Sequence, residues 1–173
     1  MYSEDVIKHF RNPHNMGKIK NPDGVGKIGN IICGDVMWLY IKVGKSASRR
    51  KKGQEIIKDI KFETFGCTAA IATSSMITDL AKGKTLEEAL KIDKNKITDS
   101  LGGLPPIKIH CSVLANDALT EAIYDYFSKK GRLISKELKE RHQHIKREKE
   151  IIEEKYKDWI GKQEEAVGET IDN

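Results

Sequence analysis

The sequence is poor in cysteine, aromatic side chains and long apolar runs. Its three cysteines are an odd number, which cannot all pair as disulfides within one chain. No apolar run approaches the ~20 residues needed to cross a bilayer. The start, "MYSEDVIKHF", lacks the basic and apolar segments of a secretory signal. We therefore expect a cytoplasmic protein without a membrane segment, whose thiols stay reduced.

The sequence also has little that suits nucleic-acid recognition, although its net charge is +5. Much of the excess lies in "KSASRRKKGQE" (45–55), where Arg49, Arg50, Lys51 and Lys52 are consecutive. Aromatic residues make up 6% of the chain, and none lies in this block to stack on bases. A solvated, exposed loop is the commoner meaning of such a run, so we do not expect a nucleic-acid partner.

The apolar pattern predicts an α+β domain. "VMWLYIKV" (36–43) has the composition of a buried strand, and 56–66 is expected to pair with it as a hairpin around the basic block. We predict a small antiparallel three-stranded sheet with helices packed on it, and turns in "NPHNMG" and "NPDGVG". Helices are expected over 3–11 with Ser3 as N-cap, from 68 to Lys82-Gly83, from the Thr85 capping box onward, and from 112 to Gly131.

The chain changes character at residue 132, after which it is highly charged. Leu138, Ile145, Ile152 and Trp159 recur every seven residues, which predicts a further helix with a thin apolar stripe. We therefore divide the chain into a domain over 1–131 and a charged helical extension over 132–173. The stripe would let the extension dock on the domain or pair lightly with another chain.

The cysteines lie in three separate contexts, "NIICGDVM", "TFGCTAAIA" and "KIHCSVLA". Because no CxxC is present, zinc-ribbon and thioredoxin-type sites lose their main signature. Cys67 and Cys111 each precede a predicted helix, whose positive end favours the thiolate that binds metals. A single free cysteine is more often a small core residue. Here, however, Cys33, Cys67 and Cys111 all have loop-forming or titratable neighbours, which favours a shared site assembled by the fold.

Asp35 and His110 are the candidate partners of these thiols, since each lies within two residues of a cysteine. Three thiolates with one oxygen or nitrogen donor could hold Zn²⁺ tetrahedrally or a [2Fe–2S] cluster. A carboxylate is a hard ligand among soft thiolates, which suits temporary storage of a cluster. The remaining histidines have no such neighbours, and we assign surface or packing roles to His9, His14, His142 and His144.

Several motifs together resemble the IscU scaffold family of iron–sulfur cluster assembly, also called NifU-like N-terminal. They are "YSEDVIKHFRNPHNMG", "CGDVM", "FGC-AAIA-SS", "KGKTLEEAL" and "LPPIKIHCSVLA-DAL", within about residues 2–130. The last is the most specific. Its Leu-Pro-Pro-Ile-Lys stretch and His110 resemble the ISC-type branch, since the related SufU branch lacks both features.

The resemblance implies a non-enzymatic scaffold that assembles a labile [2Fe–2S] cluster and transfers it to acceptor apoproteins. It implies Cys33, Cys67 and Cys111 as cluster ligands, with Asp35 or His110 in the fourth position. A cysteine desulfurase would supply persulfide sulfur, with Cys111 a favoured acceptor, and Fe²⁺ and a ferredoxin would complete the cluster. An Hsp70-type chaperone, with its co-chaperone, would dock on an extended peptide formed by Leu104, Pro105, Pro106, Ile107 and Lys108.

The sequence departs from the family in three places. "GNII" (29–32) stands where the family usually has Gly-Ala-Pro-Ala, Thr68 replaces a glycine that follows the second cysteine, and the basic block 45–52 is an insertion. The first two bear on the shape of the ligand loops.

Other readings stay open at this point. A structural or regulatory zinc protein would use the same ligands, and the apo scaffold would also take Zn²⁺. A nucleophilic enzyme using Cys111 is not expected, because His110 is adjacent in sequence and such neighbours do not easily form a nucleophile–base pair. A homodimer or another homo-oligomer, with a cluster shared between chains, is equally open.

Overall fold

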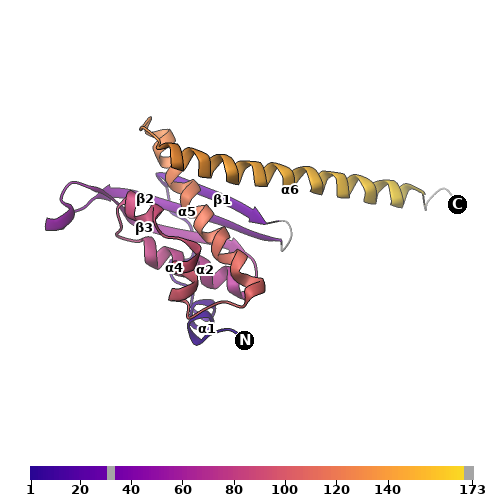
Figure 1. Ribbon diagram of the computed structural model, residues 1–173, viewed down its shortest axis with the longest axis horizontal. Helices are drawn as coiled ribbons and strands as arrows, with labels where there is room; N and C mark the ends of the chain where they lie inside the picture. Colours follow the sequence, from indigo (N-terminus) through magenta and orange to yellow (C-terminus); the bar gives the residue numbers. More distant parts are fainter. Residues whose placement is uncertain (31–33, 170–173) are drawn as a thin grey trace.

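The protein is described by a computed structural model that covers residues 1–30 and 34–169, without the side chains of 152, 155, 156 and 158–169. The predicted α+β class is confirmed. Three antiparallel strands form one sheet in the order β1 (Gly24–Asn30), β2 (Asp35–Lys45) and β3 (Glu55–Phe65) (Figure 1). Leu39 of the central strand lies opposite Gly26 on one side and Phe62 on the other. Buried and half-buried residues alternate along β2, as expected for a sheet with one covered face.

Helices cover that face of the sheet. α5 runs along β1 and β2, while α2 packs beside it and against β3 (Figure 1). The apolar side chains of the sheet, among them Met37, Leu39 and Phe62, are fully buried beneath these two helices. The helices are α1 (Glu4–Arg11), α2 (Thr68–Ala81), α3 (Leu86–Leu90), α4 (Lys94–Ser100), α5 (Ile109–Lys129) and α6 (Lys136–Glu169), with short 3₁₀ turns η1 (Arg49–Lys51) and η2 (Pro106–Lys108).

The caps predicted from sequence are present. The Ser3 hydroxyl accepts a hydrogen bond from the Val6 amide at 3.1 Å, and Thr85 and Glu88 form the capping box that begins α3. Two elements differ from prediction. α4 was missed, although Asp93 caps it by accepting from the Lys96 amide at 2.8 Å. The end of "NPDGVG" was wrongly assigned to a turn, because its last residues begin β1.

Glycines in β1 explain both its turn-like sequence and its place in the fold. A β-carbon built at Gly26 would overlap the carbonyl oxygen of Ala118, and one at Gly24 would overlap that of Ala122. The backbone of α5 therefore lies directly against the backbone of β1, a closeness that any side chain would prevent. This contact fixes α5, and with it the helix start that carries Cys111.

The loop between β2 and β3 is partly fastened. Within the basic block, Lys51 Nζ lies 2.5 Å from Glu88 Oε2, which ties the 3₁₀ turn to α3. Because one of the block's four consecutive cations is already paired, the block is less open for other anions than its sequence suggests.

The predicted C-terminal helix is present, and its first half docks on the domain. Leu138 and Ile145 are buried, while Ile152 and Trp159, the other members of the heptad stripe, have side chains outside the described set. Arg141 donates to the Leu90 carbonyl at 3.2 Å, to Asn116 Oδ1 at 2.7 Å and to Thr120 Oγ1 at 2.6 Å. The second half of α6 projects beyond the domain (Figure 1). Among the described residues, no helix is long and apolar enough to cross a membrane.

The β1–α5 contact yields a stability test. We expect Gly26→Ala to lower the free energy of unfolding by about 1–3 kcal/mol or more, because the added methyl group meets backbone that cannot turn away. Urea denaturation followed by circular dichroism measures the change. Gly29→Ala is the matched control, since a β-carbon there makes only ordinary contacts, with Val36 Cγ2 at 3.8 Å and the Asp35 carbonyl oxygen at 4.0 Å. Equal denaturation midpoints for the two variants would contradict the close approach.

Candidate metal centre

Two of the three cysteines meet at the starts of two helices. Cys67 is the N-cap of α2, and Cys111 is the third residue of α5. Their sulfur atoms lie 3.9 Å apart, although 44 residues separate them in sequence. The prediction that distant segments bring these thiols together therefore holds for this pair. Thr68, which replaces the family's usual glycine, is simply the first residue of α2.

One carboxylate oxygen of Asp35 forms a triangle with the two sulfurs. Asp35 is the first residue of β2, it is 3% exposed, and its Oδ2 atom is 3.9 Å from the sulfur of Cys67 and from that of Cys111. Its Oδ1 atom accepts a hydrogen bond from the Cys67 amide at 3.3 Å. Gly66 makes this possible, because a β-carbon there would be 2.9 Å from Asp35 Oδ1. One oxygen of Asp35 and the two sulfurs form a compact set within 4.8 Å.

His110 also belongs to the site. Its Nε2 atom lies 3.6 Å from the Cys111 sulfur. The two side chains are therefore in contact at the start of α5, although such neighbours were not expected to form the nucleophile–base pair of an enzyme. The imidazole can serve as a further nitrogen ligand or as a proton acceptor for Cys111.

Lys108 is a member of the site that sequence reasoning did not place there. Its Nζ atom lies 3.6 Å from the Cys67 sulfur. The charge of that sulfur is the main cause that raises the pKa of Lys108 above its usual value. The sequence did contain a signal that could have placed Lys108 in the site. This lysine lies three residues before Cys111 at a helix start, and residues with that spacing share one face of a helix.

The Leu-Pro-Pro-Ile-Lys stretch, residues 104–108, is attached to the site at both ends. Leu104 packs against the buried cluster around Cys111, and Lys108 contacts Cys67. Between them Ile107 is 77% exposed. The prediction of an extended peptide is correct for Pro105, with φ −54° and ψ 141°, but wrong for Pro106–Lys108, which form a 3₁₀ turn.

The third cysteine, Cys33, lies outside the described residues. The residues on either side of its segment are placed: Asn30 and Asp35 are paired across the ends of β1 and β2. Cys33 precedes Asp35 by two residues in the sequence.

Access to the site is limited. Cys111 has no exposed surface, while Cys67 is half-buried.

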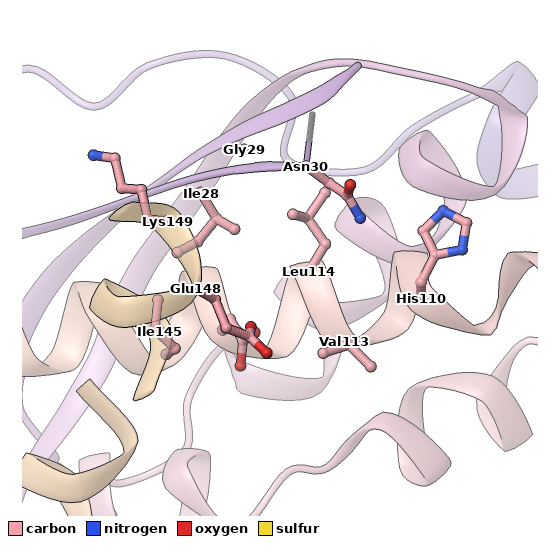
Figure 2. Close-up of a pocket in the computed structure, with 10 residues that line it drawn as sticks. Ile28, Gly29, Asn30, His110, Val113, Leu114, Ile145, Glu148 and Lys149 are labelled. Carbon is pink, nitrogen blue, oxygen red and sulfur yellow. The ribbon is translucent and has the colours of Figure 1, made fainter. Parts of the chain in front are cut away.

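Beside the site, His110 lies at one end of a cavity of about 160 Å³ between β1, α5 and α6 (Figure 2). The extension contributes Ile145 and Glu148 to its wall, and burial raises the pKa of Asp117 there to about 6. The C-terminal extension therefore reaches to the neighbourhood of the metal centre.

The donors suit a metal that accepts both sulfur and a harder ligand. Thiolate sulfur and imidazole nitrogen bind zinc and iron, and a carboxylate oxygen can complete either set. Because Asp35 is buried against both sulfurs, a metal in this position would be held by groups from β2, α2 and α5 together.

Comparison with known proteins places this chain in a family. The NifU-like N terminal domain matches residues 1–133. The chain is 57% identical over 133 residues to the iron-sulfur cluster assembly scaffold protein IscU 1 of Archaeoglobus fulgidus, covering 77% of this chain and 81% of the relative. It is 48% identical over 132 residues to IscU of Escherichia coli K12, covering 75% of this chain and 96% of the relative.

Solved structures agree on the fold. A putative iron-sulfur cluster assembly scaffold protein for the SUF system from Fervidobacterium islandicum AW-1 is 25% identical with a TM-score of 0.53, over 70% of this chain and 96% of that one. A NifU-like protein from Brucella abortus is 17% identical with a TM-score of 0.56, over 73% and 94%. By its matched domain and its relatives, the chain belongs to the NifU-like N-terminal domain family, which includes the IscU proteins.

Proposed function

We propose that this protein is a scaffold on which an iron–sulfur cluster is assembled and from which it passes to other proteins. The observation that carries the proposal is the meeting of the Cys67 and Cys111 sulfurs with one oxygen of Asp35. Relatives with about half of their residues identical are named as scaffold proteins for cluster assembly, and not as enzymes. These names favour cluster assembly over a structural or regulatory zinc protein, and Zn²⁺ would bind the same donors in the apo form.

We propose a [2Fe–2S] cluster as the cargo. Such a cluster needs four protein ligands. Cys33, Cys67 and Cys111 would supply three of them, and Asp35 or His110 the fourth. The contacts of Asp35 with both sulfurs favour it for the fourth position, and His110 is close enough to Cys111 to replace it during transfer. A carboxylate bound to iron would make the cluster easier to release.

Sulfur would come from the persulfide of a cysteine desulfurase. A Cys111 thiolate would attack the outer sulfur, form a new S–S bond and release the desulfurase thiolate. Two electrons, supplied by a ferredoxin, would then cleave that bond and leave sulfide for Fe²⁺. Because Cys111 has no exposed surface, this step would require the surrounding side chains to move; Tyr2 and Leu104 are among those that pack against its buried cluster.

A chaperone of the Hsp70 type, assisted by a co-chaperone, would bind the stretch 104–108. The exposed Ile107 offers an apolar contact surface for the chaperone, while Leu104 and Lys108 reach the metal centre. Pulling this stretch away would remove the cation next to Cys67 and uncover Cys111. Chaperone binding and cluster release would therefore be coupled through the same five residues.

We propose the cytoplasm as the compartment, because the site needs reduced thiols. The division into a domain over 1–131 and an extension over 132–173 stays a proposal. Leu138 and Ile145 are buried where α6 contacts α5, which supports an extension whose first half packs on its own domain.

Anaerobic reconstitution tests the scaffold function. With Fe²⁺, sulfide and thiol, we expect the protein to develop the visible absorption of a [2Fe–2S] chromophore. Cys33→Ala, Cys67→Ala and Cys111→Ala should each lose it, because each would remove one of few ligands. Thr68→Ser, next to Cys67 at the same helix start, is the control that should retain it. A colourless protein that binds only zinc would refute the proposal.

The Asp35 carboxylate provides a second test. We expect Asp35→Ala to slow cluster transfer to an acceptor apoprotein roughly tenfold, the scale on which groups around a metal change its binding. The holo lifetime should lengthen in parallel, as measured by the decay of visible absorption. Asp99→Ala, on the exposed face of α4, is the control. An unchanged transfer rate in a folded Asp35→Ala protein would remove Asp35 from the mechanism.

A further inference from the structure

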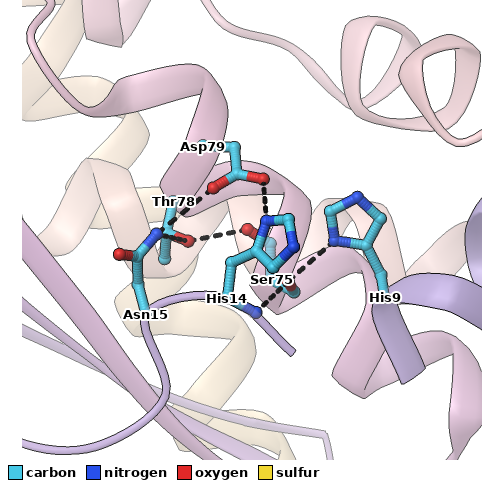
Figure 3. Close-up of polar contacts among 6 residues, drawn as sticks. All are labelled: His9, His14, Asn15, Ser75, Thr78 and Asp79. Carbon is cyan, nitrogen blue, oxygen red and sulfur yellow. Dashed lines mark hydrogen bonds and ion pairs between the residues drawn. The ribbon is translucent and has the colours of Figure 1, made fainter. Parts of the chain in front are cut away.

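A second cluster of metal-binding side chains lies away from the metal centre, where the end of α1 meets the C-terminal half of α2. It consists of His9, His14 and Asp79 (Figure 3). One ring nitrogen of each histidine and one carboxylate oxygen of Asp79 lie within 4.8 Å of one another. Asp79 is twelve residues after Cys67, so about 18 Å of helix axis separates the two sites.

The histidines face one another across a short distance. The centroids of their rings are 4.7 Å apart, with the planes inclined by 53°. His14 Nδ1 lies 2.6 Å from Asp79 Oδ2. Alone, this histidine–carboxylate pair would be an ordinary surface interaction between two segments. The second imidazole beside it is what turns the pair into a convergent donor set.

Neighbouring groups hold these side chains in position. The Ser75 hydroxyl lies 2.8 Å from His9 Nδ1 and accepts a hydrogen bond from the His14 amide at 2.8 Å. The side-chain amide of Asn15 donates to Asp79 Oδ1 at 3.2 Å and to Thr78 Oγ1 at 3.0 Å. Asn15 adopts a left-handed φ of 57°, a conformation that asparagine tolerates better than most residues. Ligands oriented by such outer hydrogen bonds are typical of metal sites.

The site is also accessible from solvent, and the charge state of its side chains suits the binding of a cation. His14 and Asp79 have side chains 50% and 36% exposed, so an ion can enter from solvent. Burial, and then the neighbouring His14, lower the pKa of His9, which favours the unprotonated ring that binds metals. No hydrogen bond within the described part of the chain uses Nε2 of either histidine.

We propose that His9, His14 and Asp79 form a second metal site, which binds a divalent first-row transition ion of the Fe²⁺ or Zn²⁺ kind. Two imidazoles and one carboxylate are a donor set that both ions accept, with the remaining positions open to water. Bonds of about 2 Å would draw the donors closer than they lie now, which small rotations of exposed side chains permit. The inference does not depend on cluster assembly, since it uses none of the cysteines.

The test removes the first site in the full chain. In a Cys33→Ser, Cys67→Ser, Cys111→Ser protein, equilibrium dialysis against Zn²⁺, and anaerobically against Fe²⁺, should show one bound ion per chain. Adding His14→Gln or Asp79→Asn should weaken binding by about tenfold or more. Asp79→Asn is the sharper variant, because the amide keeps the size of the side chain and one acceptor oxygen, while it removes the charge and replaces the other oxygen by an NH₂ group.

His144→Gln is the matched control. His144 Nε2 lies 3.3 Å from Glu148 Oε1, so it is an exposed histidine–carboxylate pair that lacks a second imidazole, and its loss should leave binding unchanged. If the serine protein does not fold, Co²⁺ titration of the unmodified chain separates the sites. Only thiolate ligation gives a sulfur-to-cobalt charge-transfer band, so we expect a further ion bound without it and lost in Asp79→Asn. Binding that is absent, or equal in Asp79→Asn and His144→Gln, would overturn the proposal.

Discussion

The placement of the Asp35 carboxylate against two cysteine sulfurs is the contact on which the candidate site depends. Asp35 stands at the start of β2, Cys67 at the start of α2 and Cys111 at the start of α5, so the contact requires the starts of three elements to meet at one point. Gly66 admits the carboxylate, and Gly26 lets α5 lie on the backbone of β1. Two glycines, one beside the donors and one in β1, thus determine whether the donors can meet.

Burial gives this contact its chemical character. A carboxylate that is 3% exposed beside two sulfurs is costly unless a cation or a donor offsets its charge. The Cys67 amide offsets part of it, and Lys108 offers a cation to the neighbouring sulfur. Lys108 belongs to the same stretch as the exposed Ile107. A change in the position of Ile107 at the surface can therefore alter the balance of charge around the buried carboxylate and sulfurs. This coupling would let a buried site load and unload without unfolding the domain.

Much of the fold could be predicted from the sequence, because caps, strands and helices follow from residues that are close together in the chain. The Ser3 and Thr85 caps, the hairpin strands and the charged final helix followed from side-chain pattern. Glycine-rich β1 was not readable locally, since its sequence is that of a turn and only packing against α5 explains it. The contact of Lys108 with the Cys67 sulfur and that of His14 with Asp79 join segments far apart in the sequence, so only the fold reveals them. His110 lies next to Cys111 in the sequence, but the side-chain pattern does not say which way its ring turns.

The direct measure of the central claim is the iron and acid-labile sulfide content of the anaerobically purified full chain, per mole of protein. We expect equal molar amounts of iron and sulfide, both falling together in Cys67→Ala, because in the proposed scaffold the sulfurs and Asp35 would hold a cluster and not a lone ion. Zinc or iron without sulfide, retained after anaerobic reconstitution, would contradict it.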